Sequence, residues 1–153
     1  LKKKNSKFFL TIIGSGPQES NLKAQAKKYK INESIKWLRR VEREDLFKIF
    51  SKSDLLFFPS LRDSGGFVVL EAMSYGLPVS TLNLGGPGQI VNNECGIQIE
   101  VGNKTENEII LELTSRINYL FNNRDELFFK GNKSIERAKE FNWKKKAHLI
   151  YDK

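Results

Sequence analysis

The sequence predicts an α/β fold, with an open, mostly parallel sheet and helices on both of its faces. Short apolar runs alternate with segments that carry the apolar spacing of amphipathic helices. The runs are almost continuously apolar, which is typical of strands buried on both faces in a parallel sheet. Glycine and proline follow several of them, where a strand turns toward the next helix. At 153 residues, the chain has the length of one domain, and we expect residues 1–153 to form it.

Each element is expected from a local signal in the chain. Five apolar runs are expected to be strands: 7–13, 35–38, 54–58, 78–82 and 96–99. Segments with helical spacing or helix-boundary residues are expected to be helices: 17–30, 42–52, 67–75, 89–92, 106–121, 125–141 and 143–151. Pro17 suits the first position of the first helix, because its missing N–H would be unpaired there. Gly76, with Pro78 just beyond, suits the end of the third.

Four loops follow the predicted strands: 14–17, 38–41, 59–66 and 82–88. In an open parallel sheet these loops share the carboxyl edge, where ligands bind. Gly65 and Gly66 directly precede a predicted helix, and the free N–H groups and dipole at a helix start attract anions. The sequence therefore predicts an anion site at the start of helix 67–75. Gly14 and Gly16 do not complete a G-x-G-x-x-G motif, so turn geometry and ligand binding both stay open for them.

Two carboxylates flank this predicted anion site. Asp63 lies in the loop and Glu71 lies in the helix, so both can face one cleft. Carboxylates accept hydrogen bonds from neighbouring sugar hydroxyls, while N–H groups hold a phosphate. Two alternatives stay open: Asp63 as a turn or cap residue, and Glu71 as a solvated helix residue. The apolar neighbours of Glu71 favour its burial.

The distribution of charge along the chain is more informative than the net charge about nucleic-acid binding. The net charge is +8, distributed as +8 over residues 1–50, −3 over 51–100 and +3 over 101–153. The acidic middle third, which holds the unusual residues, does not suit a groove that tracks nucleic-acid phosphates. Solvated helix faces are the simpler interpretation of the lysines. RNA binding or contact with an anionic membrane, through the lysines at 2–4 and 144–146, stays an alternative.

Other residue types have plainer interpretations. Cys95 is most simply a small buried residue, and a single cysteine and a single histidine give no disulfide or metal framework. Four phenylalanines fall on core-facing patterns, so base stacking is not needed to explain them: Phe57, Phe58, Phe67 and Phe121. A non-catalytic module that binds a nucleotide or another phospho-ligand on the same fold is an alternative function. Its receiver-like form is disfavoured, because a receiver needs an acidic cluster at the end of the first strand, where this chain has Gly14-Ser15-Gly16.

The stretch PSLRDSGGFVVLEAMSYGLPV, residues 59–79, resembles the signature of retaining nucleotide-sugar glycosyltransferases of the GT-B fold, group 1 or family 4 type. That family pairs two acidic residues, here Asp63 and Glu71, and follows them with Ala-Met and Gly-x-Pro-Val. Further similar motifs are Gly14-Ser15-Gly16-Pro17, Ser53-Asp54, Gly85-Gly86 and Phe141-Asn142-Trp143, so the resemblance covers nearly the whole chain. Asp63 stands where the family usually has Glu, and Gln89 where an acidic residue is common.

The resemblance implies a role for each matching residue. Glu71 would bind the ribose hydroxyls and Asp63 the donor-sugar hydroxyls, which makes these two the candidate catalytic residues. The loop and helix start would hold the diphosphate, through Ser64, Gly65, Gly66, Phe67 and Val68. Arg40 would lie by the base or phosphates, and Gly16 would line the nucleotide cleft.

The resemblance also implies the setting of the chain. It would be the Rossmann-like, C-terminal donor-binding domain of a glycosyltransferase, with the N-terminal acceptor domain outside this sequence and no activity without it. The donor would be a UDP-, GDP- or ADP-sugar, bound without a metal or other cofactor. The acceptor would be a polysaccharide, a glycolipid or another molecule. We expect a cytoplasmic location, with weak contact at the inner face of the membrane as an alternative and no nucleic-acid partner.

Overall fold

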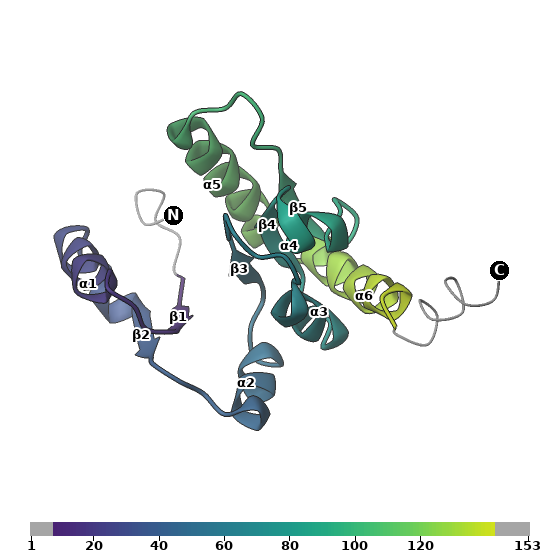
Figure 1. The fold of residues 1–153 in the computed structure, drawn as a ribbon, viewed down its shortest axis with the longest axis horizontal. Helices are drawn as coiled ribbons and strands as arrows, with labels where there is room; N and C mark the ends of the chain where they lie inside the picture. The colour runs from purple at the N-terminus through teal and green to yellow at the C-terminus, as the bar shows by residue number, and fades with distance from the viewer. Residues whose placement is uncertain (1–7, 143–153) are drawn as a thin grey trace. The chain divides into compact units, whose positions relative to one another are not determined.

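The computed structural model describes residues 8–142. The elements in chain order are β1 (Leu10–Ile13), α1 (Glu19–Lys28), the 3₁₀ helix η2 (Asn32–Ser34), β2 (Ile35–Leu38), α2 (Arg43–Phe50), β3 (Leu56–Phe58), α3 (Phe67–Ser74), β4 (Val79–Leu82), α4 (Gly85–Ile90), β5 (Gly96–Ile99), α5 (Glu106–Asn122) and α6 (Arg124–Glu140) (Figure 1). Every predicted strand is present, within two or three residues of its expected ends. The helix expected at 143–151 lies outside the described residues.

The chain divides into two compact units, Leu1–Leu46 and Phe47–Lys153. The strands accordingly lie in two sheets, with β1 and β2 in the first unit and the order β3-β4-β5 in the second. All three strand pairs are parallel, which confirms the α/β class with parallel strands. That the whole chain forms one domain stays a prediction.

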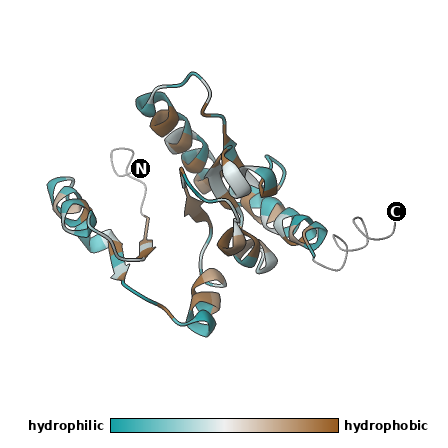
Figure 2. Cartoon of the chain, in the orientation of Figure 1, coloured by the Kyte–Doolittle hydropathy of each residue, from teal (hydrophilic) through white to brown (hydrophobic). Residues whose placement is uncertain are grey.

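The first unit is a strand–helix–strand segment with a small core. At the carboxyl edge of its sheet, the Gly14 N–H donates to the Leu38 carbonyl over 2.9 Å. Helix α1 begins at Glu19 rather than at Pro17, because residues 16–19 form a turn in which the Glu19 N–H donates to the Gly16 carbonyl. Ala26 is the buried residue of α1, and Figure 2 shows this helix as largely hydrophilic.

The second unit holds the main hydrophobic core. Strand β4 is buried at all four of its residues, as a central strand with covered faces should be. On one face of the sheet, residues from β4, β5, α5 and α6 form a cluster: Leu82, Ile97, Ile99, Leu113, Leu120 and Leu127. On the other face, Gln98 of β5 donates to a carbonyl of α4, and α3, whose Val69, Ala72 and Met73 are buried, begins directly against α4. Helices therefore cover both faces of this sheet.

Two expectations about the second unit need correction. Helix α4 begins at Gly85, four residues before the expected start, although its sequence GGPGQI is poor in helix formers. Phe57 and Phe67 are 45% and 66% exposed rather than buried. Phe67 is the first residue of α3 and precedes its buried stripe, so its position along the helix, not its apolar character, decides its exposure.

Helix α5 begins with a capping box that gives a test of its local stability. The Glu108 N–H donates to Thr105 Oγ1 over 3.4 Å, and the Thr105 N–H donates to the Glu108 carboxylate over 2.7 Å. We expect Thr105→Ala to lower the free energy of unfolding by about 1 kcal/mol, because it leaves a helix-end donor unpaired. Urea denaturation measures this loss, and Asn103→Ala, an exposed change outside the box, should have little effect.

The capping box also predicts a dependence on pH. The hydrogen bond from the Thr105 backbone holds the pKa of Glu108 below its ordinary value of 4.5. A lowered folded pKa stabilises the protein above pH 4.5, and this contribution is lost as the pH falls through the folded pKa. Glu108→Gln removes the titrating carboxylate, so the difference in the free energy of unfolding between Glu108→Gln and the unmodified chain should shrink in strong acid. An equal difference at pH 7 and pH 3 would contradict this assignment.

Candidate functional site at the start of α3

Asp63 closes the loop between β3 and α3. Its Oδ1 accepts hydrogen bonds from the backbone N–H groups of Gly65, at 3.0 Å, and of Gly66, at 2.6 Å. Gly66 is the N-cap of α3 and has φ +64°, a left-handed conformation that glycine adopts without strain. Asp63 is thus a turn residue in this structure, one of the two roles that the sequence left open. Its charge also lies at the positive end of the helix dipole.

The pairing of Asp63 decides which N–H groups remain for a ligand. The first N–H groups of a helix have no partner within it, and the repeating pattern here begins with the Leu70 N–H, which donates to the Gly66 carbonyl. The Gly65 and Gly66 N–H groups are already bound to Asp63. Phe67 and Val68 therefore supply the N–H groups best placed to receive a phosphate. For Gly66 to take the predicted role, Asp63 would have to release it.

Glu71 lies on the same helix as these two amides. It is half-buried, and it follows Phe67 by four residues and Val68 by three, which are the spacings of neighbours on one helix face. The α3 helix is fixed beneath it by the fully buried Val69 and Ala72. The sequence predicted that the apolar neighbours of Glu71 would favour its burial, and its side chain is half-buried on α3.

The loop that follows β4 lies directly against the Asp63 loop. The Gly86 N–H donates to the Asp63 carbonyl over 2.9 Å. A Cβ at Gly85 would lie 2.2 Å from that same carbonyl oxygen, and one at Gly86 would lie 2.6 Å from the Ser64 carbonyl oxygen. Only glycine allows so close an approach between the two backbones. The structure thus brings together the predicted loops 59–66 and 82–88, and Ser64 is exposed within the first of them.

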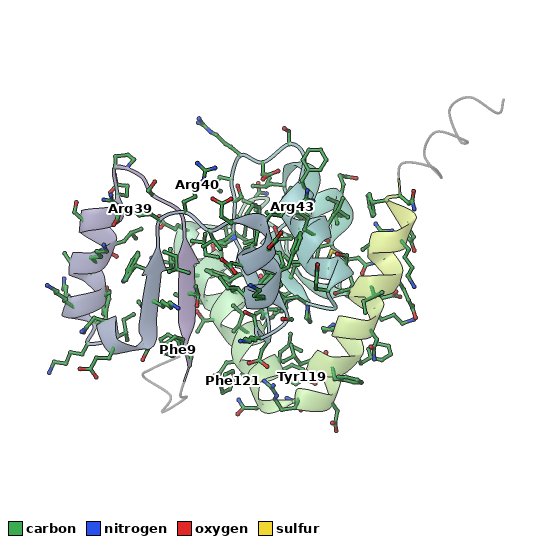
Figure 3. The ribbon with its side chains drawn as sticks, turned by 90° about the horizontal axis from the view of Figure 1, so that it is seen from below. Phe9, Arg39, Arg40, Arg43, Tyr119 and Phe121 are labelled. Carbon is green, nitrogen blue, oxygen red and sulfur yellow. The ribbon has the colours of Figure 1, made fainter. Side chains whose placement is uncertain are left out.

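Gly16, Arg39 and Arg40 belong to the first unit. Gly14 has φ +141°, a backbone conformation that favours glycine. Gly16 has no such conformation, and a Cβ there would meet nothing within 4 Å. Figure 3 shows Arg39 and Arg40 on the segment that follows β2. The Arg40 side chain is 89% exposed, with its Nε 3.8 Å from a Glu42 carboxylate oxygen. The loops 14–17 and 38–41 therefore lie at one edge of the β1–β2 sheet, and the roles of Gly16 and Arg40 stay predictions.

Two substitutions test whether the hydrogen bonds of the Asp63 turn or the charge of Asp63 stabilise the loop. Asp63→Asn keeps an oxygen at the Oδ1 position, so we expect stability to change little. Asp63→Ala removes the acceptor of two N–H groups and should cost about 1 kcal/mol, as the loss of other helix-start caps does. Urea denaturation of both variants measures the difference. Equal losses in the two would show that the charge of Asp63, rather than the turn, stabilises the loop.

Residues 8–142 can be searched for membrane-spanning helices, metal-binding clusters and a reactive thiol. In that range no helix has the length and apolar character required to cross a membrane. The same residues hold no group of three or more His, Cys, Asp and Glu side chains that could bind a metal ion. Cys95 is buried, as expected, and burial raises the pKa of its thiol above the ordinary value of 9.0.

The parallel α/β fold corresponds to that of a known enzyme family. The sequence model of the family described as "Glycosyl transferases group 1" matches residues 1–141, so the chain belongs to this family. The resemblance noted from the Asp63–Glu71 signature is thereby confirmed at the level of the family and of its GT-B fold.

Individual relatives agree with this assignment. The chain is 32% identical over 89 residues to the glycogen synthase of Mycobacterium tuberculosis, a match that covers 58% of this chain and 22% of that protein. It is 33% identical over 124 residues to an uncharacterized glycosyltransferase of Haemophilus influenzae, with 80% and 33% covered. A solved structure, the pneumococcal O-GlcNAc transferase GtfA in complex with UDP and GlcNAc, superposes with a TM-score of 0.79 at 21% identity, over 99% of this chain and 31% of that one. The chain thus spans a third or less of each of these proteins.

Proposed function

We propose that this chain is the donor-binding part of a retaining glycosyltransferase, and that it binds a nucleotide diphosphate sugar at the start of α3. The observation that supports this most strongly is the grouping at that helix end. Two N–H groups, of Phe67 and Val68, lie between a loop carboxylate, Asp63, and a helix carboxylate, Glu71. N–H groups at a helix start suit phosphates, and carboxylates suit hydroxyls, so the group matches a sugar nucleotide in both chemistries.

In this proposal each residue has a defined task. Phe67 and Val68 donate N–H hydrogen bonds to the diphosphate, and Glu71 accepts hydrogen bonds from the ribose hydroxyls. Asp63 accepts from the donor-sugar hydroxyls through Oδ2, since its Oδ1 is used by the turn. As the bond to the sugar breaks, negative charge grows on the diphosphate, and fixed N–H groups stabilise it without rearrangement. The backbone groups and the helix dipole do this without a metal ion.

The rest of the reaction is assigned to a further domain. The relatives are at least three times longer than the parts this chain matches, which supports an acceptor-binding domain elsewhere in the enzyme. Holding the acceptor against the anomeric carbon supplies a large part of the rate in reactions of this kind. We propose a polysaccharide or a glycolipid as the acceptor class, and no transfer by this chain alone.

Isothermal titration of the chain with UDP, GDP and ADP tests the proposal. We expect one of the three to bind, weakly, with the same affinity in the presence of EDTA as in its absence. The corresponding sugar nucleotide should bind at the same site and compete with it. Failure of all three to bind would contradict the donor-binding role. Binding that EDTA abolishes would contradict the metal-free arrangement.

A further inference from the structure

Helix α4 is an improbable helix on its sequence. Its six residues, GGPGQI, include three glycines and one proline. Each glycine costs about 1 kcal/mol relative to alanine inside a helix, and proline costs more away from the first turn. A segment this short and this poor in helix formers must be held by contacts from outside.

Two side chains provide those contacts, and between them they bind four consecutive carbonyls. Gln98 of β5 donates through Nε2 to the Gly88 carbonyl, at 2.5 Å, and to the Val91 carbonyl, at 2.9 Å. Arg137 of α6 donates through Nε to the Ile90 carbonyl, at 2.9 Å, and through Nη2 to the carbonyl of Gln89, at 3.0 Å. The last carbonyls of a helix have no partner within it. Here two side chains from other elements occupy them all.

Both side chains are themselves fixed in place. Gln98 lies in the middle of β5, and its Nε2 is also 3.2 Å from Oδ1 of Asn83 at the end of β4. The Arg137 guanidinium lies over the Phe141 ring, 4.9 Å from its centroid, and forms an ion pair with Glu140. Few alternative rotamers satisfy these contacts at once, so α4 is clamped between β5 and α6.

The clamped helix in turn supports the Asp63 loop. The Gly86 N–H donates to the Asp63 carbonyl over 2.9 Å. A Cβ at Gly66 would lie 2.5 Å from Cδ1 of Ile90 and 3.2 Å from the Pro87 nitrogen, so the start of α3 rests on α4 with no space between them. A shift of α4 would therefore move the loop that carries Asp63 and Gly66.

We propose that Gln98 and Arg137 are positioning residues, which hold α4 as a support for the Asp63–Gly66 loop and so set the geometry of the donor site. Their effect on donor binding rests on the proposed function, whereas their effect on the loop does not. A lone polar residue in the buried strand GIQI is the sequence feature that marks Gln98 for such a role.

Amide hydrogen exchange, measured by NMR on the full chain, tests the effect on the loop. Gln98→Leu and Arg137→Met each remove two of the four hydrogen bonds. Ser134→Ala is the matched control, because the buried Ser134 Oγ also joins α6 to a carbonyl, but to that of Cys95 outside α4. We expect the Gly65, Gly66 and Gly86 amides to exchange about tenfold faster in the two variants and to be unchanged in Ser134→Ala.

Three results would overturn the positioning role. They are unchanged exchange at the three glycines in both variants, an equal increase in Ser134→Ala, or an increase spread evenly over the amides of β4 and β5. Arg137→Lys keeps one donor and should restore part of the protection. If Gln98→Leu does not fold, Arg137→Met carries the same test, since it leaves the sheet untouched.

Nucleotide titration separates this inference from the proposed function. For whichever of UDP, GDP and ADP binds the unmodified chain, we expect Kd to rise about tenfold in Gln98→Leu and Arg137→Met and to stay constant in Ser134→Ala. If Kd is the same in all three variants although the loop amides exchange faster, Gln98 and Arg137 position the loop but do not set the geometry of the donor site. If none of the nucleotides binds the unmodified chain, the donor-binding proposal fails, and the exchange rates alone decide whether the two residues position the loop.

Discussion

Replacing Glu71 with glutamine is expected to weaken nucleotide binding by roughly tenfold to a hundredfold. A hydrogen bond to a charged group contributes about 1.5–3 kcal/mol, and the glutamine amide keeps the shape of the side chain while removing its charge. Isothermal titration with the nucleotide that binds the unmodified chain gives the ratio of Kd values. Denaturation curves recorded on the same samples check that α3 stays folded.

Glu106→Gln is the matched control for this experiment. Glu106 is an exposed carboxylate in the first turn of α5, a helix that packs on the cluster of Leu82, Ile97 and Ile99. The same loss of charge there should leave the affinity unchanged. If Glu71→Gln binds as tightly as Glu106→Gln, then Glu71 is the solvated helix residue that its sequence also permitted.

Replacing Gly85 with alanine is expected to abolish the geometry of the site. The new Cβ would lie 2.2 Å from the Asp63 carbonyl oxygen, and φ at this position is +54°. The new Cβ would clash with main-chain atoms, which cannot rotate away as a side chain can, so one of the two loops must move. We expect a loss of about 1–3 kcal/mol in the free energy of unfolding, and at least a tenfold loss of nucleotide affinity. Urea denaturation and isothermal titration measure the two effects.

Gly102→Ala separates the clash from the backbone strain. Gly102 also has a positive φ, of +35°, but a Cβ there would meet nothing within 4 Å. This variant should show the cost of the conformation alone, about 1 kcal/mol, and no change in nucleotide affinity. Equal effects of the two substitutions on affinity would show that the contact between the 63–66 and 85–88 loops does not shape the site.

The local elements could be predicted because each depends on a signal within a few residues. The strand 96–99 and the helix beginning at Glu106 are each marked by their own apolar pattern. Gly76 has φ +75° at the end of α3, as its place before Pro78 indicated. These features need no knowledge of the rest of the fold.

The start of helix α4 at Gly85 and the exposure of Phe67 could not be predicted in the same way. The residues of α4 disfavour a helix, and the contacts that hold it come from Gln98 and Arg137, which lie up to 48 positions from the carbonyls they bind. The use of the Gly65 and Gly66 N–H groups by Asp63 depends on loop geometry that residue types alone leave open. The sequence thus pointed to the Asp63 loop and the start of α3 as the candidate site, and the structure adds how the hydrogen bonds there are divided.

A titration followed by NMR tests the central claim most directly. The ¹⁵N-labelled chain is titrated with the nucleotide that binds, and the amide signals that shift are mapped onto the sequence. The donor-site proposal predicts the largest shifts at Phe67 and Val68, with smaller ones at Gly65 and Gly66 as the Asp63 turn responds. Shifts confined to residues outside 63–71, or a complete absence of shifts in α3, would contradict it.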